Sequence, residues 1–408
     1  MQSKDMSEKK TDIVVVGAGL TGLSFCNLLK DTNTKIFILD NHSEEYFREV
    51  NNDRHIVLSN TSKIILEKLS LWEKIENYCS KVKNIHISKK NIFGSTLIRS
   101  TDENLDSLGY QVPIKYLIRC LYENIKNVKN FEFLYESEVL EVSNGNLVKL
   151  RYKQNARENL VIANSAIFSS GYTDSIFQDI FIEKVEKKYN QNAVACEVIS
   201  SENNSDTAYE RFTDQGIIAA IPRKENSWTL IYSTSEEESK KIINFSKKDA
   251  KIYFQKLVGK KCGIFSQVNN IKSYPLQLKY YKKFINKNIC LLGDAAHTLH
   301  PIAAQSFNLS LRDCTFLTNQ IKKNKSKKNV KYEDIFQEYY EERIKEQIRL
   351  VKFTDFLASY IHGNGFFKNN LVGVGLMFLD INKNIRVNTI RYLLGVNFSQ
   401  SLITNLTE

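Results

Sequence analysis

The fold is decided by residues 11–40, which read TDIVVVGAGLTGLSFCNLLKDTNTKIFILD. The run Thr11–Val16 is rich in β-branched residues, which is typical of a buried parallel strand. Leu23–Lys30 has the apolar face of a helix, and Lys35–Leu39 is a second strand candidate. Strand, glycine-rich turn, helix and strand within about 30 residues predict a β-α-β unit that opens an α/β sheet.

The turn Gly17–Gly22 has the spacing of a dinucleotide-binding turn. Gly17 permits the tight turn, Gly19 lets the backbone approach a pyrophosphate, and Gly22 lets the helix pack close to the strand. The helix N-terminus then offers free N–H groups to the phosphates. Asp40 ends the second strand, where a ribose hydroxyl would bind. We therefore predict a dinucleotide site, and the alternative is an ordinary strand-turn-helix with glycine in its turn.

The composition bounds the class of protein. The 408 residues include only 16 glycines and 4 prolines, and 42% are hydrophobic. This excludes collagen-like and low-complexity chains, and the length favours two or three domains. The longest uncharged apolar stretch near the end, Leu371–Leu379, is far shorter than the roughly 20 residues that span a bilayer. The first ten residues, MQSKDMSEKK, lack a signal-like apolar run and are expected to be a frayed tail.

Cysteine, histidine and charge patterns indicate no metal and no nucleic acid. Seven scattered cysteines without a CxxC pair predict buried thiols and a reduced, cytoplasmic setting, and the six histidines show no zinc spacing. The net charge is +11, but base-reading motifs are absent, so we expect a solvated basic surface. The lysine-rich run Lys322–Lys331 predicts an exposed loop, with weak docking at the inner face of a membrane as the alternative.

A second motif, Gly293–Pro301, reads GDAAHTLHP. It follows the strand candidate NICLLG, so Asp294 would place a carboxylate at the sheet edge where open α/β sheets bind ligands. Taken alone, Asp294 could equally be a helix cap. Pro301 precedes a helix that we expect to begin near Ala303 and to aim its N-terminus above the sheet.

These motifs together resemble the FAD-dependent aromatic hydroxylases (class A flavoprotein monooxygenases), and within them the ubiquinone-biosynthesis hydroxylases. The family pattern joins a glycine-rich turn near the start to GDAAHxxHPxxGQGxNxGxxD. This chain reads GDAAHTLHPIAAQSFNLSLRD from Gly293 to Asp313. Similar segments are RHIVLSNTS at 54–62, LGYQV at 108–112, YNQNAVACEV at 189–198 and AYERFTDQGIIAAIP at 208–222.

The resemblance implies an α/β fold with a Rossmann-like FAD-binding domain, an inserted and mostly antiparallel substrate domain, and a helical C-terminal region. Strand candidates between about 190 and 280, separated by turn clusters, favour the same antiparallel sheet. The expected boundaries are 11–185 for the first part of the FAD domain, with a small substrate-domain excursion near 80–110, then 186–282 for the substrate domain. The FAD domain returns at 283–330, and the helical region is 331–408.

The resemblance also implies site residues. The ADP part of FAD would bind at the glycine-rich turn and at the acid that ends the second strand. Arg54 would lie near the phosphates, Asp294 would hydrogen-bond the ribityl chain, and at Gly293 the backbone would approach FAD. Pro301 and Asn308 would face the isoalloxazine ring, beside a helix dipole that stabilises negative charge on the reduced flavin. No metal is expected, no catalytic base is assigned, and His297 and His300 are interpreted as structural.

The implied reaction uses NAD(P)H to reduce the flavin and O2 to hydroxylate an electron-rich phenol, here a small aromatic or a polyprenylated ubiquinone precursor. The ring would lie between the FAD domain and the antiparallel sheet. Tyr209, Arg211, Phe212 and Pro222 are candidates for ring contact, and core packing is their alternative. The C-terminal helices would pack in the core, cover a polyprenyl tail, or dock onto a membrane or a quinone-biosynthesis complex. The oligomeric state is not predicted.

The chain departs from the family pattern in three places. The family's Asp-Gly motif reads Ser170-Gly171 here and no arginine follows, which weakens the case for NAD(P)H. The GQG beside the flavin is Ala304-Gln305-Ser306, and a later glycine is Ser310. A Cβ at these positions would crowd the flavin, unless the site is wider elsewhere, and left-handed backbone there would be strained. Pro113 and Ile114 replace residues that could reach FAD. The second hypothesis is therefore a non-hydroxylating relative that acts as an accessory or scaffold subunit.

Overall fold

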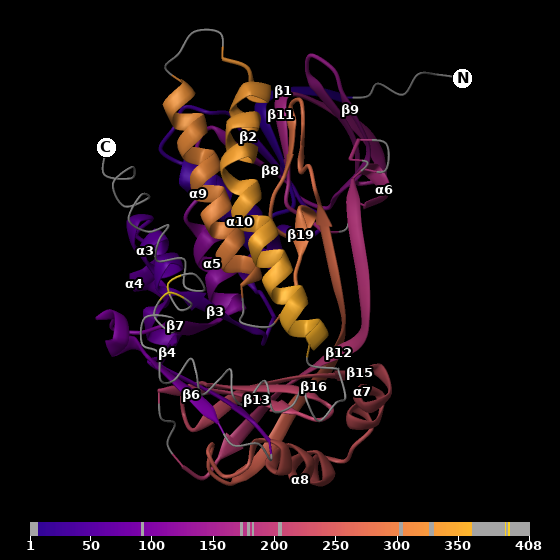
Figure 1. Cartoon of the computed structure of the whole chain (residues 1–408). Coiled ribbons are helices and arrows are strands. Elements are labelled where there is room, and N and C mark those ends of the chain that lie inside the picture. Colours follow the sequence, from indigo (N-terminus) through magenta and orange to yellow (C-terminus); the bar gives the residue numbers. More distant parts are fainter. Residues whose placement is uncertain are drawn as a thin grey trace.

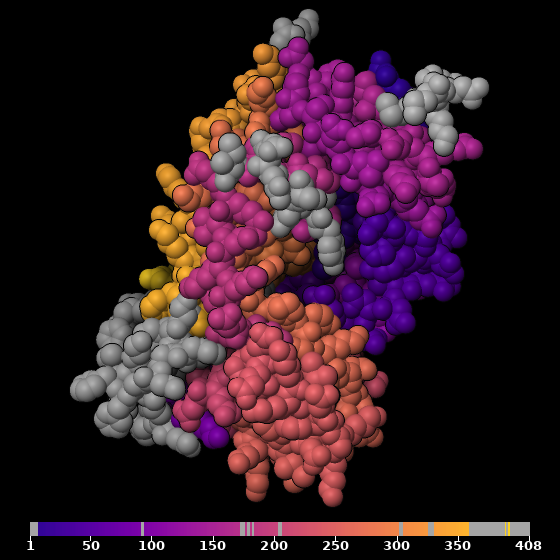
Figure 2. All heavy atoms as spheres, turned by 90° about the vertical axis from the view of Figure 1, so that its right-hand side faces the viewer, coloured from indigo at the N-terminus to yellow at the C-terminus, as the bar shows by residue number. Residues whose placement is uncertain are grey.

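The computed structural model describes residues 7–90, 94–171, 174–177, 180–181, 183–202, 206–301, 305–325, 330–360, 388 and 391. Figure 1 shows an upper body, in which long helices lie along one sheet, and a lower lobe built on a second sheet. In the orthogonal view of Figure 2 the lobe is a rounded mass below the body.

The first sheet has a parallel centre. Its strands, in spatial order, are β17 (Ile285–Asn286), β18 (Ile289–Leu291), β11 (Arg157–Phe168), β1 (Ser7–Val16), β2 (Ile36–Leu39) and β8 (Phe131–Leu134). From β18 to β8 all neighbours run parallel, and β9 (Ser137–Asn144) and β10 (Val148–Gln154) extend β11 on an antiparallel branch. The register Val16↔Phe168 and Val16↔Leu39 brings three strand ends to one edge, where ligands of open α/β sheets bind.

Four helices cover this sheet: α1 (Leu20–Leu29), α5 (Ile114–Glu123), α9 (Ser306–Lys325) and α10 (Tyr332–Tyr360). Helix α1 is apolar on nearly all sides because it packs between the sheet, α5 and α9. Phe25, Leu121 and Leu311 are fully buried in the shared core. Each such side chain stabilises the fold by about 1.5–3 kcal/mol relative to exposure.

The second sheet is antiparallel except where β13 meets β5. Its strands, in spatial order, are β19 (His297–Thr298), β16 (Phe265–Tyr281), β12 (Lys184–Ser200), β15 (Ser227–Ser235), β14 (Gly216–Pro222), β13 (Thr207–Thr213), β5 (Asn84–Lys89) and β6 (Ser95–Arg99). Helices α7 (Glu236–Ile243) and α8 (Lys247–Val258) cover one face around Trp228 and Phe254. The long strands β12 and β16 connect this lobe to the upper body (Figure 1).

A three-stranded sheet, β3 (His55–Ser59), β7 (Gly109–Pro113) and β4 (Ser80–Val82), lies beside the body. The short elements are α2 (Glu44–Arg48), α3 (Asn60–Lys68), α4 (Trp72–Ile75), η1 (Glu76–Tyr78), η2 (Ser100–Glu103), α6 (Asp174–Phe177) and η3 (Gly293–Ala295). The helical spacing of Thr61–Ile75 is divided between α3 and α4. The chain breaks there because Ser70 adopts a left-handed conformation, with φ of 55°.

The predicted fold class is confirmed, with three local corrections. The first strand begins at Ser7, which pairs with Asn159, so residues 7–10 are not a frayed tail. Residues 322–325 of the lysine-rich run belong to α9, because the apolar face of that helix continues to Ile321; residues 326–329 lie outside the described part. Among the described residues no helix is long and apolar enough to cross a membrane. The domain boundaries stay predictions.

Candidate cofactor and substrate site

The glycine-rich turn needs glycine at its two ends for different reasons. Gly17 has φ of 101°, in the left-handed region, and its N–H donates to the Leu39 carbonyl at 2.8 Å. A Cβ on Gly22 would lie 1.9 Å from the Gly17 carbonyl oxygen. Both glycines therefore serve the path of the backbone itself.

Gly19 differs because it faces open space. A Cβ there would have no heavy atom within 4 Å, and its φ of −72° is open to any residue. Gly19 is the N-cap of α1, and no side chain caps the N-terminal N–H groups of this helix. Gly19 and Thr21 line a cavity, so these unsatisfied donors and the positive end of the helix dipole face a space that an anion can enter.

Asp40 lies at the end of β2, as predicted, and its carboxylate is mostly buried. Its Oδ2 accepts the Ala18 N–H at 2.6 Å, and its Oδ1 accepts the His42 N–H at 2.9 Å. The His42 Nδ1 lies 2.7 Å from the same Oδ1. The carboxylate therefore ties the end of β2 to the turn, with acceptor capacity left for one further donor.

Gly293 and Asp294 approach the turn from the next strand, β18. Gly293 has φ of 58°, and a Cβ there would lie 2.5 Å from the Thr21 Oγ1, so glycine is required for η3 to pack against α1. Asp294 follows with an exposed carboxylate that lines the cavity. The Ser306 hydroxyl donates to its Oδ1 at 3.4 Å. The predicted carboxylate at the sheet edge is thus beside the N-terminus of α9.

The cavity extends from the turn to the second sheet and has a volume of about 560 Å³. The uncovered face of the second sheet forms its far wall, with Ala195 on β12, Thr229 and Ile231 on β15, and Leu276 on β16. This volume lies within the roughly 300–1,000 Å³ of typical cofactor and ligand sites. The cavity therefore joins phosphate-binding features at one end to a largely apolar wall at the other.

Arg54 and Pro301 both line this cavity, and their contacts with FAD stay predictions. The exposed Arg54 guanidinium lies 5.4 Å from the centre of the Tyr274 ring on β16. The Arg54 carbonyl accepts the N–H of Ile114, which follows Pro113, at 2.9 Å. Ile114 also lines the cavity, and the loss of contacts with FAD at Pro113 and Ile114 stays a prediction.

Asn308 does not line the cavity, and its contact with the flavin ring stays a prediction. Its Oδ1 accepts the Ser59 N–H at 2.8 Å and the Ser62 hydroxyl at 2.7 Å, and its Nδ2 donates to the Val57 carbonyl at 2.9 Å. The side chain is 2% exposed. Residues 306, 307 and 310 of α9 line the cavity, so helical geometry directs residue 308 toward β3 and α3. The hydrogen bonds of its amide connect these two elements to α9.

Two of the candidates for ring contact, Tyr209 and Arg211 on β13, do not line this cavity. Tyr209 and Arg211 lie on the opposite face of the second sheet, because strand residues alternate between faces. The cavity wall comes instead mainly from β12, which contains the family-like segment 189–198, and from β15, which contains none of the segments named above. The period-two pattern of β12 carries a signal for this wall, since Val194 and Val198 are buried in the lobe whereas Ala195 and Glu197 line the cavity.

His297 and His300 are buried and do not line the cavity, in line with a structural role. His297 Nε2 lies 3.5 Å from the Asp313 carboxylate on α9. That carboxylate also accepts Arg343 Nε at 2.7 Å and Gln347 Nε2 at 2.8 Å from α10. Burial opposes ionisation of Asp313, but the Arg343 guanidinium and His297 hold its pKa below the usual range.

The expected backbone strain is absent where the structure describes the replaced glycines. Ser306 and Ser310 are residues of α9, and neither has a positive φ. The Ser310 hydroxyl donates to the Ser306 carbonyl at 2.9 Å, within the helix. Ala304 lies outside the described residues. Serine at 306 and 310 therefore narrows the cavity by one side chain each without distorting the backbone.

A neutral histidine lies at the cavity wall. Burial, and then the positive charge of Arg223, lower the pKa of His55 to about 4. The unfolded chain, with a pKa near 6.5, binds the proton first as the pH falls. We therefore expect stability to fall from pH 6.5 to pH 4, and His55→Gln to reduce this loss. Urea unfolding at pH 7 and pH 5 measures it, and an unchanged pH dependence in the variant would contradict the assignment.

Fold and site together define a dinucleotide-binding protein of the α/β class with a ligand cavity under a second sheet. A family described as "FAD binding domain" matches residues 10–354, and the chain belongs to this family. FAD is therefore its cofactor, as predicted.

Relatives and solved structures agree with the family. Ubiquinone hydroxylase UbiM of Neisseria meningitidis is 25% identical over 317 residues, covering 76% of this chain and 68% of the relative. The 3-demethoxyubiquinol 3-hydroxylase of Escherichia coli is 21% identical over 318 residues, covering 76% of this chain and 78% of the relative. The crystal structure of p-nitrophenol 4-monooxygenase PnpA from Pseudomonas putida shares the fold, with a TM-score of 0.76, 13% identity and coverage of 97% and 98%. The predicted class of enzyme, FAD-dependent monooxygenases, is confirmed.

Proposed function

We propose that this protein hydroxylates the ring of a phenol, using NAD(P)H and O2, and that the phenol is a polyprenylated ubiquinone precursor. The proposal rests on one observation: a continuous cavity joins the N-terminus of α1 to the open face of the second sheet. One ligand bound at the turn and another bound against the sheet would meet inside it.

The residues at the turn fit FAD. The uncapped N-terminus of α1 and the open space at Gly19 suit a pyrophosphate, and the exposed Arg54 guanidinium adds positive charge at the cavity. Asp40 has acceptor capacity for a ribose hydroxyl, and Asp294 is an acceptor at the next strand end. When bound, FAD supplies the redox and oxygen-transfer chemistry, and the protein's part is binding and orientation.

The sheet wall suits a flat aromatic ring. Ala195 and Ile231 leave a shallow apolar surface, and Thr229 adds a hydroxyl that accepts a hydrogen bond from Gln111 Nε2 at 2.7 Å. Glu197 and Arg223 form an ion pair at 2.9 Å at the same wall. These groups would orient the ring and limit water in the cavity. A polyprenyl tail would keep the substrate in a membrane, so we propose a cytoplasmic protein that meets it at the inner membrane face.

The second candidate, a non-hydroxylating accessory subunit of a quinone-biosynthesis complex, is favoured by one observation. The family's Asp-Gly motif reads Ser170-Gly171 here, and the Ser169 hydroxyl directly before it donates to the Gly17 carbonyl at 2.9 Å. It therefore serves packing of the turn. If NAD(P)H binding needs the acid and arginine absent from this stretch, FAD would remain bound and would not be reduced.

Visible spectroscopy of the purified protein separates the two candidates. We expect a yellow protein whose flavin absorbance is bleached by NADPH under argon, faster with 2-prenylphenol present. A flavin that NADPH cannot bleach, even with the phenol, would favour the accessory subunit. A colourless protein that takes up no added FAD would contradict both.

A further inference from the structure

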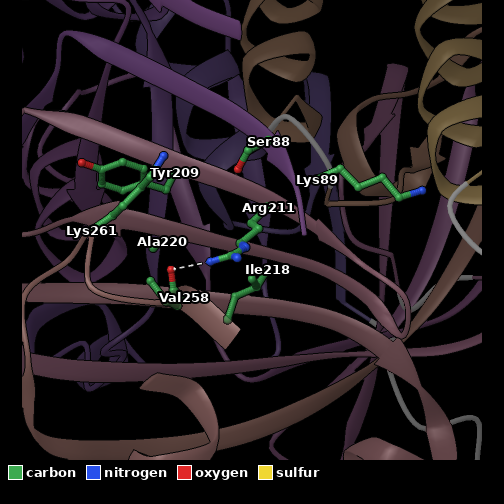
Figure 3. A pocket seen from close by; sticks show the side chains of 8 residues that line it. All are labelled: Ser88, Lys89, Tyr209, Arg211, Ile218, Ala220, Val258 and Lys261. Atoms are coloured by element: carbon green, nitrogen blue, oxygen red, sulfur yellow. Dashed lines mark hydrogen bonds between the residues drawn. The ribbon is translucent and has the colours of Figure 1, made fainter. Parts of the chain in front are cut away.

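A second, smaller cavity lies on the other side of the second sheet and belongs to neither FAD nor the ring-binding wall. Its volume is about 180 Å³, and Figure 3 shows its lining side chains. On β14, Ile218 and Ala220 face this cavity, whereas Ile221 faces the larger one. The two sites are therefore separated by the thickness of the sheet.

Arg211 lies in the middle of this cavity (Figure 3). Its Nη1 donates to the carbonyl of Val258, the last residue of α8, at 3.0 Å. A guanidinium has five N–H donors in a planar fork, so this bond to the helix end uses only one of them. The remaining donors are held in a fixed orientation beside the cavity.

Lys261 adds a second cation. Its Nζ lies 3.0 Å from His86 Nε2 and 5.7 Å from the centre of the Tyr209 ring. Burial, and then the nearby charge of Arg211, lower the pKa of Lys261. Among the described residues, no carboxylate forms an ion pair with Arg211 or Lys261. The two positive charges thus repel each other across a cavity in which an anion would stabilise both.

We propose that this cavity binds a small organic anion, a carboxylate on a short apolar body. The Arg211 fork and the Lys261 amine would hold the carboxylate, because planar guanidinium groups pair with carboxylates in two parallel hydrogen bonds. Ile218, Ala220 and Val258 form an apolar floor for the body of the ligand, beside the Tyr209 ring. The volume of about 180 Å³ excludes FAD and a polyprenyl chain and admits a molecule of the size of benzoate.

Calorimetric titration of the FAD-bound protein with benzoate tests this site. Arg211→Gln and Lys261→Gln are each expected to weaken benzoate binding by at least about tenfold, since each removes a charge-assisted contact. Lys248→Gln is the matched control, because it removes the same charge from an exposed residue of α8 that does not line this cavity. The dissociation constant should not change in this variant. The melting temperature of each variant checks that α8 keeps its C-terminal contact.

Weakening by Lys261→Gln in a protein that melts normally supports the site even if Arg211→Gln disturbs α8. No measurable binding, or equal affinity in both variants and the unmodified protein, overturns it, because benzoate would then bind only at the flavin cavity or nowhere. A titration with inorganic phosphate tests whether negative charge alone is sufficient for binding. If phosphate binds more tightly than benzoate at Arg211 and Lys261, the apolar part of the proposal is wrong.

Discussion

Gly19→Val is expected to weaken FAD binding at least about a hundredfold while leaving the protein folded. The position faces open space, and its φ is accessible to valine, so the fold has no need of glycine there. The branched side chain would instead fill the space through which a pyrophosphate reaches the N–H groups of α1. The cost to stability is expected to be that of a changed N-cap, about 1 kcal/mol or less.

Fluorescence titration of the apoprotein with FAD, together with urea unfolding, measures both effects. Gly22→Ala is the matched control within the same turn. Its Cβ would meet the Gly17 carbonyl oxygen at 1.9 Å, so this variant should lose stability as well as FAD. A Gly19→Val protein that binds FAD as tightly as the unmodified chain would show that the pyrophosphate lies elsewhere.

Arg343→Met is expected to lower the free energy of unfolding by about 3–5 kcal/mol, because it leaves the Asp313 carboxylate buried without its cation. The carboxylate is fully buried, and Arg343 Nε donates to it at 2.7 Å. Lys240→Met is the control, because Lys240 Nζ lies 2.7 Å from Glu236 Oε1 in an exposed ion pair on α7. This variant is expected to lower the free energy of unfolding by less than about 1 kcal/mol. Urea unfolding at pH 7 compares the two.

The pH dependence of stability and a double variant test whether the loss of the Arg343–Asp313 ion pair destabilises Arg343→Met. Since the folded-state pKa of Asp313 is lowered, its contribution is present above the unfolded-state value and is lost as the pH falls through the folded-state pKa. The difference between Arg343→Met and the unmodified protein should therefore shrink in acid. Adding Asp313→Leu should restore much of the stability, because an apolar pair carries no desolvation cost. If Arg343→Met costs no more than Lys240→Met, α10 is not fastened to α9 in this way.

The parts of the site that are local in sequence could be predicted, and the parts that depend on register could not. Gly17 to Gly22 and Asp40 lie within one β-α-β unit, where strand and helix periods fix their places. Asp294 follows its strand directly, so the sheet edge was predictable for it too. These positions need only local geometry and the parallel order of the strands.

The ring-binding wall depends on which face of a strand meets the cavity, and a shift of one residue reverses that choice. The sequence alone therefore leaves both ring contact and core packing open for Tyr209 and Arg211, and it does not distinguish Ala195 and Thr229 as residues of the wall. On a helix, the corresponding quantity is the rotation of each residue about the helix axis, and Asn308 illustrates it. Its position two residues after Ser306 turns it from the cavity toward β3, and nothing in the motif reports that rotation.

The source of the oxygen atom in the product tests directly whether the protein hydroxylates a phenol. The FAD-bound protein is incubated with NADPH, 2-prenylphenol and ¹⁸O2, and the phenol is recovered for mass spectrometry. We predict a ring-hydroxylated phenol that carries one ¹⁸O atom, and no such product from Gly19→Val. NADPH oxidation that yields only hydrogen peroxide, with the phenol recovered unchanged, would contradict hydroxylation in this cavity.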